Sequence, residues 1–294
     1  MLATGSILVP LDGSQLSERS LPYAAALGRA LQRKLVLITA AYISDIPGHG
    51  PWSDAMVDRP HETCMAYLTG VRERMGVPDT ELVVKVGYPH ETILDTAREV
   101  DASLIVASTH GRSGLSRWMY GSTVGHLLHA SHVPLFSVGK GVPPAETFAP
   151  KHLLVPLDGS ALGEAALPNA MELAAAFGAK ITLIRIAPFS SEAFSMTVPP
   201  MHWPTLDADL VASATAYLEE VRSTLEQTVE IKVLQGARAD ALLGFAETSG
   251  VDLVVMTTHG RAGVQRAILG STADRMLDGR APVLLIRPEE PAAS

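Results

Sequence analysis

Two glycine-rich stretches of the sequence combine the residue types that bind phosphate. The first, STHGRSGLSRWMYGST, runs from Ser108 to Thr123, and the second, TTHGRAGVQRAILGST, runs from Thr257 to Thr272. Their glycines let backbone N–H groups come close to a ligand. An arginine follows the first glycine of each stretch and could pair with a phosphate. We therefore expect each stretch to hold a ligand that carries phosphate groups.

Each stretch ends in Gly-Ser-Thr and leads into residues at helical spacing. Ser122 and Ser271 stand where a helix would begin, so we expect them to be N-cap residues. A helix N-terminus offers unpaired N–H groups and the positive end of a dipole to an anion. The histidines before the first glycines, His110 and His259, are expected to orient the loops. No Ser–His–Asp spacing or carboxylate pair accompanies them, so no catalytic residue is predicted.

An aspartate follows the first expected strand in both halves of the chain. Asp12 and Asp158 each begin a DGS sequence after an apolar run. The carboxyl ends of parallel strands share one edge of a sheet, where ligands bind. Each carboxylate could accept hydrogen bonds from a ribose or base, or hold Mg²⁺ beside phosphates. It could instead cap the turn that follows it. Because the same aspartate heads both copies, the sequence favours the ligand role.

The elements that position these residues belong to a duplicated chain. The VPLDGS, THGR and GST sequences recur in the same order about 146 to 149 residues later. Near-continuous apolar runs alternate with segments of helical periodicity, which indicates parallel strands covered on both faces. The predicted fold class is α/β, with two tandem doubly wound domains that each contain a five-stranded parallel sheet. In the first half, strands are expected at 7–11, 34–42, 81–87, 103–109 and 133–138, and helices at 20–32, 61–75, 90–100 and 122–131.

The domains are expected at residues 1–140 and 150–290, with a Gly- and Pro-rich linker at 141–149. Two intervals, 43–60 and 188–204, are rich in Pro and carry His and Trp. They occupy equivalent places after the second strand of each half. They predict long surface loops, either with an apolar anchor or with a functional role.

Composition excludes several classes of partner. The net charge of −8 argues against nucleic acid or an anionic membrane. No apolar run reaches the roughly 18 residues of a membrane span, and the first residues lack the pattern of a signal peptide. The single cysteine, Cys64, predicts a small apolar residue in a reducing compartment, so a cytoplasmic location is expected. The histidines show no metal-ligand spacing.

These motifs together resemble the universal stress protein family, and the chain looks like a tandem member with two such domains. ATP-binding members of that family carry a glycine, two residues, a second glycine, nine residues, and then Gly-Ser or Gly-Thr. Gly111 and Gly260 are each followed by nine residues and then Gly-Ser, and VPLDGS leads each copy. The resemblance covers nearly the whole chain, from about residue 4 to residue 287.

One position of the family motif differs in both copies. The family's first glycine falls at Ser108 and at Thr257. A Cβ atom there would hinder binding if the backbone needs a positive φ or lies against the ligand. If the position only ends a strand, the hydroxyl could instead help to bind phosphate.

The resemblance implies a Rossmann-like, adenine nucleotide alpha-hydrolase-like fold that binds ATP. Mg²⁺ at Asp12 and Asp158, as a companion of the nucleotide, stays one of the roles open to these carboxylates. Adenine and ribose would lie at the ends of the strands, at Pro10, Asp12, Ala40 and Ala107 in the first domain and at Pro156, Asp158, Ile186 and Met256 in the second. The phosphates would lie along the glycine loop. The implied nucleotide-binding residues of the first domain are Pro10, Asp12, Ala40, Ala107, Ser108, His110, Gly111, Arg112, Gly114, Gly121, Ser122 and Thr123. Those of the second are Pro156, Asp158, Ile186, Met256, Thr257, His259, Gly260, Arg261, Gly263, Gly270, Ser271 and Thr272.

Domains of this family pair through their last strands. The resemblance therefore implies that residues 133–138 pair with residues 283–287 inside one chain, which makes the fused domains a pseudo-dimer. It is also compatible with a homodimer of whole chains.

The function expected from these observations is nucleotide binding, with ATP as the ligand, in a stress-response regulatory protein that is not an enzyme. Two alternatives stay open: a scaffold that has lost nucleotide binding and acts through protein contacts, and a slow ATP hydrolase. Ala40 and Ala107 are replaced by the larger Ile186 and Met256 in the second copy, so the two sites are expected to differ in affinity.

Overall fold

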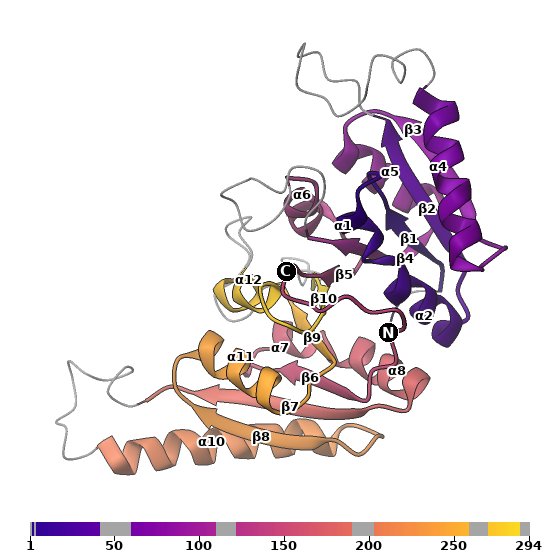
Figure 1. The fold of residues 1–294 in the computed structure, drawn as a ribbon. Coiled ribbons are helices and arrows are strands. Elements are labelled where there is room, and N and C mark those ends of the chain that lie inside the picture. Colours follow the sequence, from indigo (N-terminus) through magenta and orange to yellow (C-terminus); the bar gives the residue numbers. More distant parts are fainter. Residues whose placement is uncertain are drawn as a thin grey trace, which may run out of the picture. The chain divides into compact units, whose positions relative to one another are not determined.

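The computed structural model describes residues 2, 4–41, 60–109, 122–189, 203–258 and 270–288. Contacts divide the chain into two compact units, Leu2–Ala149 and Pro150–Ser294. In each unit, helices cover a parallel sheet (Figure 1). None of the helices in the described ranges combines the length and apolarity that a bilayer span requires.

The N-terminal unit contains five strands in the order β3-β2-β1-β4-β5, and all four pairings are parallel. The strands are β1 (Ser6–Pro10), β2 (Leu35–Ala41), β3 (Glu81–Val86), β4 (Ala102–Ser108) and β5 (Leu135–Val138). The helices are α1 (Gln15–Glu18), α2 (Leu21–Leu31), α4 (Pro60–Met75), α5 (Pro89–Glu99) and α6 (Ser122–Ala130). Helix α2 packs beside α4, and α5 packs beside α6.

The C-terminal unit repeats this topology in the strand order β10-β9-β6-β7-β8, again with parallel pairings. Its strands are β6 (His152–Pro156), β7 (Lys180–Ala187), β8 (Glu230–Gln235), β9 (Leu253–Thr257) and β10 (Val283–Ile286). Its helices are α7 (Ala161–Glu164), α8 (Leu167–Phe177), α10 (Trp203–Ser223), α11 (Arg238–Thr248) and α12 (Ser271–Leu277).

Apolar runs form the central strands because both faces of each sheet are covered. Leu104, Ile105 and Val106 of β4 are fully buried, as are Val254 and Val255 of β9. The chain runs from β1 to its neighbour β2 on one side and later returns to β4 on the other side of β1. The C-terminal unit reverses in the same way around β6. Such a reversal opens a crevice at the carboxyl ends of the strands, which is where doubly wound folds bind ligands.

The expected fold class is confirmed, and the strands of the N-terminal unit lie within two residues of their predicted positions. The prediction missed α1 and α7, which are only four residues long and show no periodicity. It was also wrong about Ser271, which is the first helical residue of α12, while Gly270 is the N-cap. Residues 43–59 and 190–202 of the two expected long loops lie outside the described residues.

The segment between the two expected domains packs on the N-terminal unit. Val142 is 3% exposed, and its carbonyl oxygen accepts a hydrogen bond from the guanidinium group of Arg19. The ring of Phe148 lies 4.8 Å from that of Tyr23 and 5.7 Å from that of Phe136, measured between centroids. This aromatic cluster anchors the end of the N-terminal unit to its own core.

Candidate functional site

A cavity of about 320 Å³ lies at the carboxyl ends of the strands of the C-terminal unit. Its wall contains all of the predicted nucleotide-binding residues of this unit that the structure describes. They come from β6, β7, β9 and the start of α12, which are far apart in the sequence but meet at one edge of the sheet. These residues are Pro156, Asp158, Ile186, Met256, Thr257, Gly270, Ser271 and Thr272.

The matching residues of the N-terminal unit occupy the same places in its fold. Pro10 ends β1, Ala40 is the next-to-last residue of β2, and Ala107 and Ser108 end β4. Thr123 is the second residue of α6, which begins at Ser122. The topology therefore brings the carboxyl ends of β1 and β4 and the start of α6 to the crevice beside β1.

Part of both predicted sets lies outside the described residues. This applies to the glycine loops between β4 and α6 and between β9 and α12, that is, to His110, Gly111, Arg112, Gly114, Gly121, His259, Gly260, Arg261 and Gly263. Within the described ranges, no three His, Cys, Asp or Glu side chains gather as metal ligands would.

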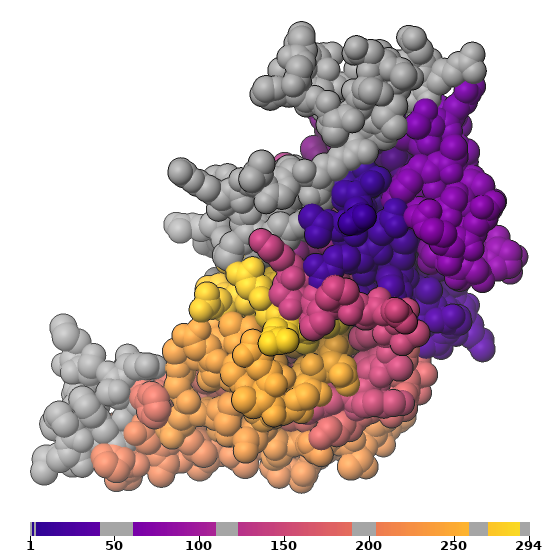
Figure 2. Space-filling view, viewed as in Figure 1, coloured from indigo at the N-terminus to yellow at the C-terminus, as the bar shows by residue number. Residues whose placement is uncertain are grey.

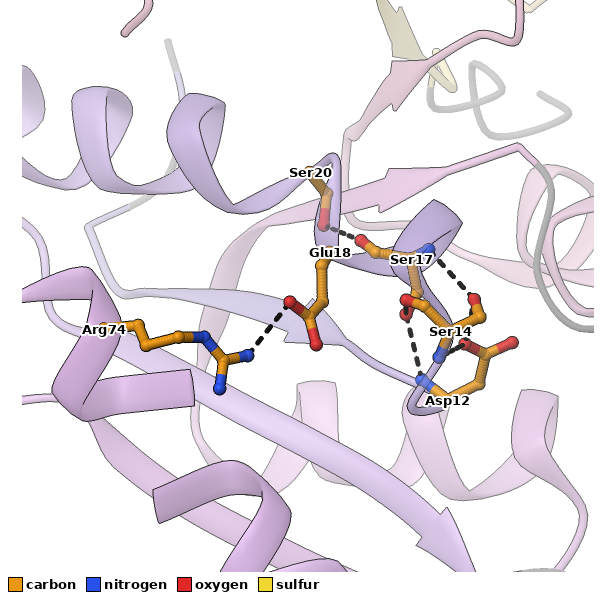
Figure 3. A network of polar contacts seen from close by, with 6 residues as sticks. All are labelled: Asp12, Ser14, Ser17, Glu18, Ser20 and Arg74. Carbon is orange, nitrogen blue, oxygen red and sulfur yellow. Dashed lines mark hydrogen bonds and ion pairs between the residues drawn. The ribbon is translucent and has the colours of Figure 1, made fainter. Parts of the chain in front are cut away.

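Both aspartates cap the turn that follows their strand. Oδ1 of Asp12 accepts hydrogen bonds from the backbone nitrogen of Ser14 at 3.0 Å and from its hydroxyl at 2.6 Å. The Ser14 hydroxyl in turn accepts from the backbone nitrogen of Ser17 at 3.1 Å, which caps α1 (Figure 3). Of the two roles that the sequence left open, the structure therefore shows the cap.

The turn of the C-terminal unit has the same geometry. Oδ1 of Asp158 accepts from the backbone nitrogen of Ser160 at 3.0 Å and from its hydroxyl at 2.6 Å. The Ser160 hydroxyl caps α7 by accepting from the backbone nitrogen of Gly163 at 3.1 Å. A Cβ atom on Gly163 would lie 2.8 Å from Oδ1 of Asp158, so this glycine lets α7 approach the carboxylate closely. The carboxylate is thus held in place on the wall of the cavity.

The two positions that depart from the family motif are ordinary strand residues. Ser108 pairs with Val138 in the β4–β5 ladder, and Thr257 pairs with Ile286 in the β9–β10 ladder. Neither has a positive φ; among the described non-glycine residues only Gln32 and Asp101 do. A Cβ atom therefore causes no backbone strain at either position. Ser108 and Thr257 therefore do not hinder ligand binding by straining the backbone.

A tyrosine and a glutamate connect the long helix to the short helix in the C-terminal unit. The hydroxyl of Tyr217 on α10 donates to Oε1 of Glu164 on α7 at 2.7 Å. The guanidinium carbon of Arg185 on β7 lies 4.6 Å from the centroid of the Tyr217 ring, a cation–π contact. Burial raises the pKa of the Tyr217 hydroxyl, and the Glu164 carboxylate raises it further.

The N-terminal unit has the same pair of residues with a different cation. Tyr67 on α4 lies near Glu18 on α1, and burial followed by the charge of Glu18 raises its pKa. Arg74 on α4 donates to Oε2 of Glu18 at 3.0 Å (Figure 3).

Sequence reasoning missed two arginines that line the cavity of the C-terminal unit, Arg185 and Arg238. Each looks like an ordinary surface charge in its own segment, and only the comparison of the two copies could have pointed to them. It also treated Cys64 as a small apolar residue, and that is confirmed, since Cys64 is 1% exposed on α4. Ala214 holds the matching place on α10 and lines the cavity.

Comparison with known proteins gives a consistent result over both units. A model of the universal stress protein family matches residues 4–138 and again residues 150–287. A universal stress protein of Mycobacterium tuberculosis is 25% identical over 295 residues, which covers 96% of each chain. One of Methanocaldococcus jannaschii is 28% identical over 141 residues, or 47% of this chain and 82% of that one.

Solved structures agree on the fold. The structure of a universal stress protein from Archaeoglobus fulgidus has a TM-score of 0.70 with 20% identity and covers 96% of this chain and 98% of that chain. A structure of a protein described as a putative universal stress protein from Pseudomonas aeruginosa has a TM-score of 0.67 with 17% identity and covers 98% and 94%. At these identities the likeness shows the shared fold.

Proposed function

This chain belongs to the universal stress protein family, and from that premise we propose that it binds ATP and acts as a nucleotide-responsive regulator without catalysing a reaction. The ligand would lie with its base and ribose at the carboxyl ends of the first two strands of a unit. Its phosphates would lie along the glycine loop. Asp12 and Asp158 would hold the ribose, or Mg²⁺ beside the phosphates.

One observation carries the proposal: every described residue of the predicted set in the C-terminal unit lines the same cavity. Its volume of about 320 Å³ lies at the lower end of the range of small-ligand sites, roughly 300 to 1,000 Å³. The wall is mixed, with apolar side chains such as Ile186 and Met256 beside a carboxylate and hydroxyl groups. Such a mixture suits a ligand with an aromatic base at one end and polar groups at the other.

Calorimetric titration of the nucleotide-stripped full-length chain with ATP and Mg²⁺ tests the proposal. We expect saturable binding in the micromolar range, which corresponds to about −8 kcal/mol. Ser271→Asp should abolish binding at the C-terminal unit, because a carboxylate would repel a phosphate. Ser271 is exposed, and an acid is well tolerated in the first turn of a helix. Ser122→Asp is the same change in the N-terminal unit.

Thr205→Asp is the matched control, because Thr205 is an exposed residue in the first turn of α10 that does not line the cavity. It should bind ATP as the unmodified chain does. No heat of binding and no rise in melting temperature at millimolar ATP would reject the proposal and favour a scaffold that acts through protein contacts. Stoichiometric release of phosphate in a single-turnover assay would instead show a hydrolase.

The cytoplasmic location expected from the single cysteine is part of the same proposal. The described Cys64 side chain is buried, as a structural thiol in a reducing compartment would be.

A further inference from the structure

Among the residues that the structure describes, the cavity wall of the C-terminal unit carries one carboxylate and two guanidinium groups. They belong to Asp158, Arg185 and Arg238. The described wall is therefore net positive, although the chain as a whole carries a net charge of −8. A positive site in an acidic protein favours an anionic ligand over a neutral one.

Arg185 is held in a fixed position. It lies in β7, and its guanidinium group stacks on the ring of Tyr217, which is anchored by its hydrogen bond to Glu164. A cation restrained in this way loses little further side-chain entropy when it meets an anion.

Arg238 stands at the rim of the cavity. It is the first residue of α11 and is exposed to solvent, and α11 lies on the surface of the unit (orange in Figure 2). Its guanidinium group has no hydrogen-bond or ion-pair partner within the described residues. The nearby acid Asp240 is contacted instead by Arg275, at 3.4 Å. Arg238 can therefore turn to a ligand without breaking an ion pair in the described structure.

The matching places in the N-terminal unit carry no charge. Pro10 pairs with Ile38 as Pro156 pairs with Ile184, so Thr39 stands where the C-terminal unit has Arg185. A glycine with positive φ precedes α5 and α11 alike, Gly87 and Gly236, and this alignment puts Pro89 in the place of Arg238. Asp12 matches Asp158. The same set of positions is thus net negative in the N-terminal unit.

We propose that Arg238 makes the C-terminal unit select its nucleotide by charge, so that affinity rises with each phosphate. Asp240 in the first turn of α11 contacts Arg275 of α12, the helix that follows the glycine loop, so the start of α11 lies beside the proposed phosphate end. Arg185 lies next to Ile186 at the base end and adds positive charge to the same wall. The N-terminal unit lacks this selection at these positions. The inference rests on the proposed function, since it assigns a preference to that same site. Guanidinium groups suit the role because they stay charged at every physiological pH and can bind phosphate oxygens in pairs.

The test compares adenosine, AMP, ADP and ATP as ligands of the full-length chain that carries Ser122→Asp, so that the C-terminal site is measured alone. Calorimetry gives each dissociation constant at low and high salt. We expect Arg238→Ala to weaken ATP binding about tenfold and adenosine binding less than twofold. A hydrogen bond to a charged group contributes enough free energy to change a dissociation constant by about tenfold or more, and adenosine has no phosphate to accept one. The loss should shrink at high salt. Arg238→Lys should recover part of it.

Arg222→Ala is the control, because Arg222 is an exposed arginine of α10 that pairs with Glu219 and lies off the cavity wall. Equal losses for adenosine and ATP, or no loss at all, would overturn the inference while leaving nucleotide binding in place. A parent chain that binds none of the four ligands would instead remove the proposed function itself.

A gain-of-charge variant provides a second, independent arm. Pro89→Arg places an arginine at the first position of α5, where proline is favoured but other residues are accepted. In a chain with Ser271→Asp, it should raise the preference of the N-terminal site for ATP over adenosine severalfold. If neither Pro89→Arg nor Arg238→Ala changes the preference for ATP over adenosine, these positions do not select the ligand by its charge.

Discussion

At the scale of single residues, Asp12 and Asp158 show how one side chain can serve the fold and the site together. One carboxylate oxygen accepts both hydrogen bonds of the DGS turn, from a backbone nitrogen and from a hydroxyl. The turn therefore fixes the direction of the carboxylate at the crevice. An aspartate that is held in this way needs little further ordering when a ligand arrives.

Two substitutions at Asp158 should separate these roles. Asp158→Ala removes the acceptor of both hydrogen bonds and should lower the free energy of unfolding by about 1 to 3 kcal/mol. Asp158→Asn keeps an acceptor oxygen but loses the charge, so it should cost less stability and still weaken binding of ATP with Mg²⁺. Urea unfolding and calorimetry measure the two effects. Equal destabilisation by Asn and Ala would mean that the charge, not the acceptor, holds the turn.

At the scale of elements, the Tyr217–Glu164 hydrogen bond ties α10 to α7 beside the cavity. Burial and the Glu164 carboxylate both favour the protonated phenol, so the pKa of Tyr217 is raised in the folded chain. An unfolded tyrosine ionises near pH 10. Above that pH the unfolded chain releases a proton that the folded chain retains, so stability that is present below about pH 10 is lost as pH rises.

Tyr217→Phe should therefore reduce the fall in stability between about pH 9 and pH 11. Thermal or urea unfolding of the two proteins across this range gives the comparison. Some slope should remain in the variant, because the pKa of Tyr67 and that of Tyr23 are raised as well, mainly by burial. Tyr88→Phe, at a residue that is 56% exposed, is the matched control. A variant whose slope equals that of the parent would show that Tyr217 does not couple folding to protons.

Element positions were predictable from the sequence where burial leaves a strong pattern. The centre of β4, Leu104 to Val106, is apolar and fully buried, and the limits of the strand were predicted within one residue. The short helices α1 and α7 were not predicted, because four residues cannot show a helical period and a serine cap decides them. The predicted cavity residues were found through motifs. Arg185 and Arg238 were missed because their place on the wall depends on how β7 and α11 meet in space.

At the scale of the whole molecule, duplication has kept the fold of the two units while the site residues have diverged. Both units keep the strand order, the DGS turn and the tyrosine–glutamate pair. They differ in charge at the site: Arg185 on β7 and Arg238 on α11 line the cavity of the C-terminal unit, whereas Thr39 and Pro89 hold the matching places in the N-terminal unit. The two proposed nucleotide sites are therefore expected to differ in the ligand that each prefers.

The pairing of the two last strands inside one chain stays a prediction of the family resemblance. Strand β5 ends the sheet order of its unit, and so does β10. Half of the amides of an edge strand point away from its own sheet. If the strands pair, residue-resolved hydrogen exchange of the full-length chain should find these amides protected in β5 and β10, unlike those in β3 and β8 at the opposite edges. Fast exchange in all four strands would reject the pairing.

The buried Cys64 side chain is a natural probe of the stability of the N-terminal unit. It is the only cysteine, it is 1% exposed, and it lies in the N-terminal unit. A thiol reagent can reach this buried side chain only when the structure around it opens, so the labelling rate measures the free energy of that opening in the N-terminal unit. The C-terminal unit contains no cysteine and therefore does not react with the reagent. If the N-terminal unit binds a nucleotide as proposed, the resulting stabilisation should slow the labelling of Cys64 in the intact chain, and no added label is needed.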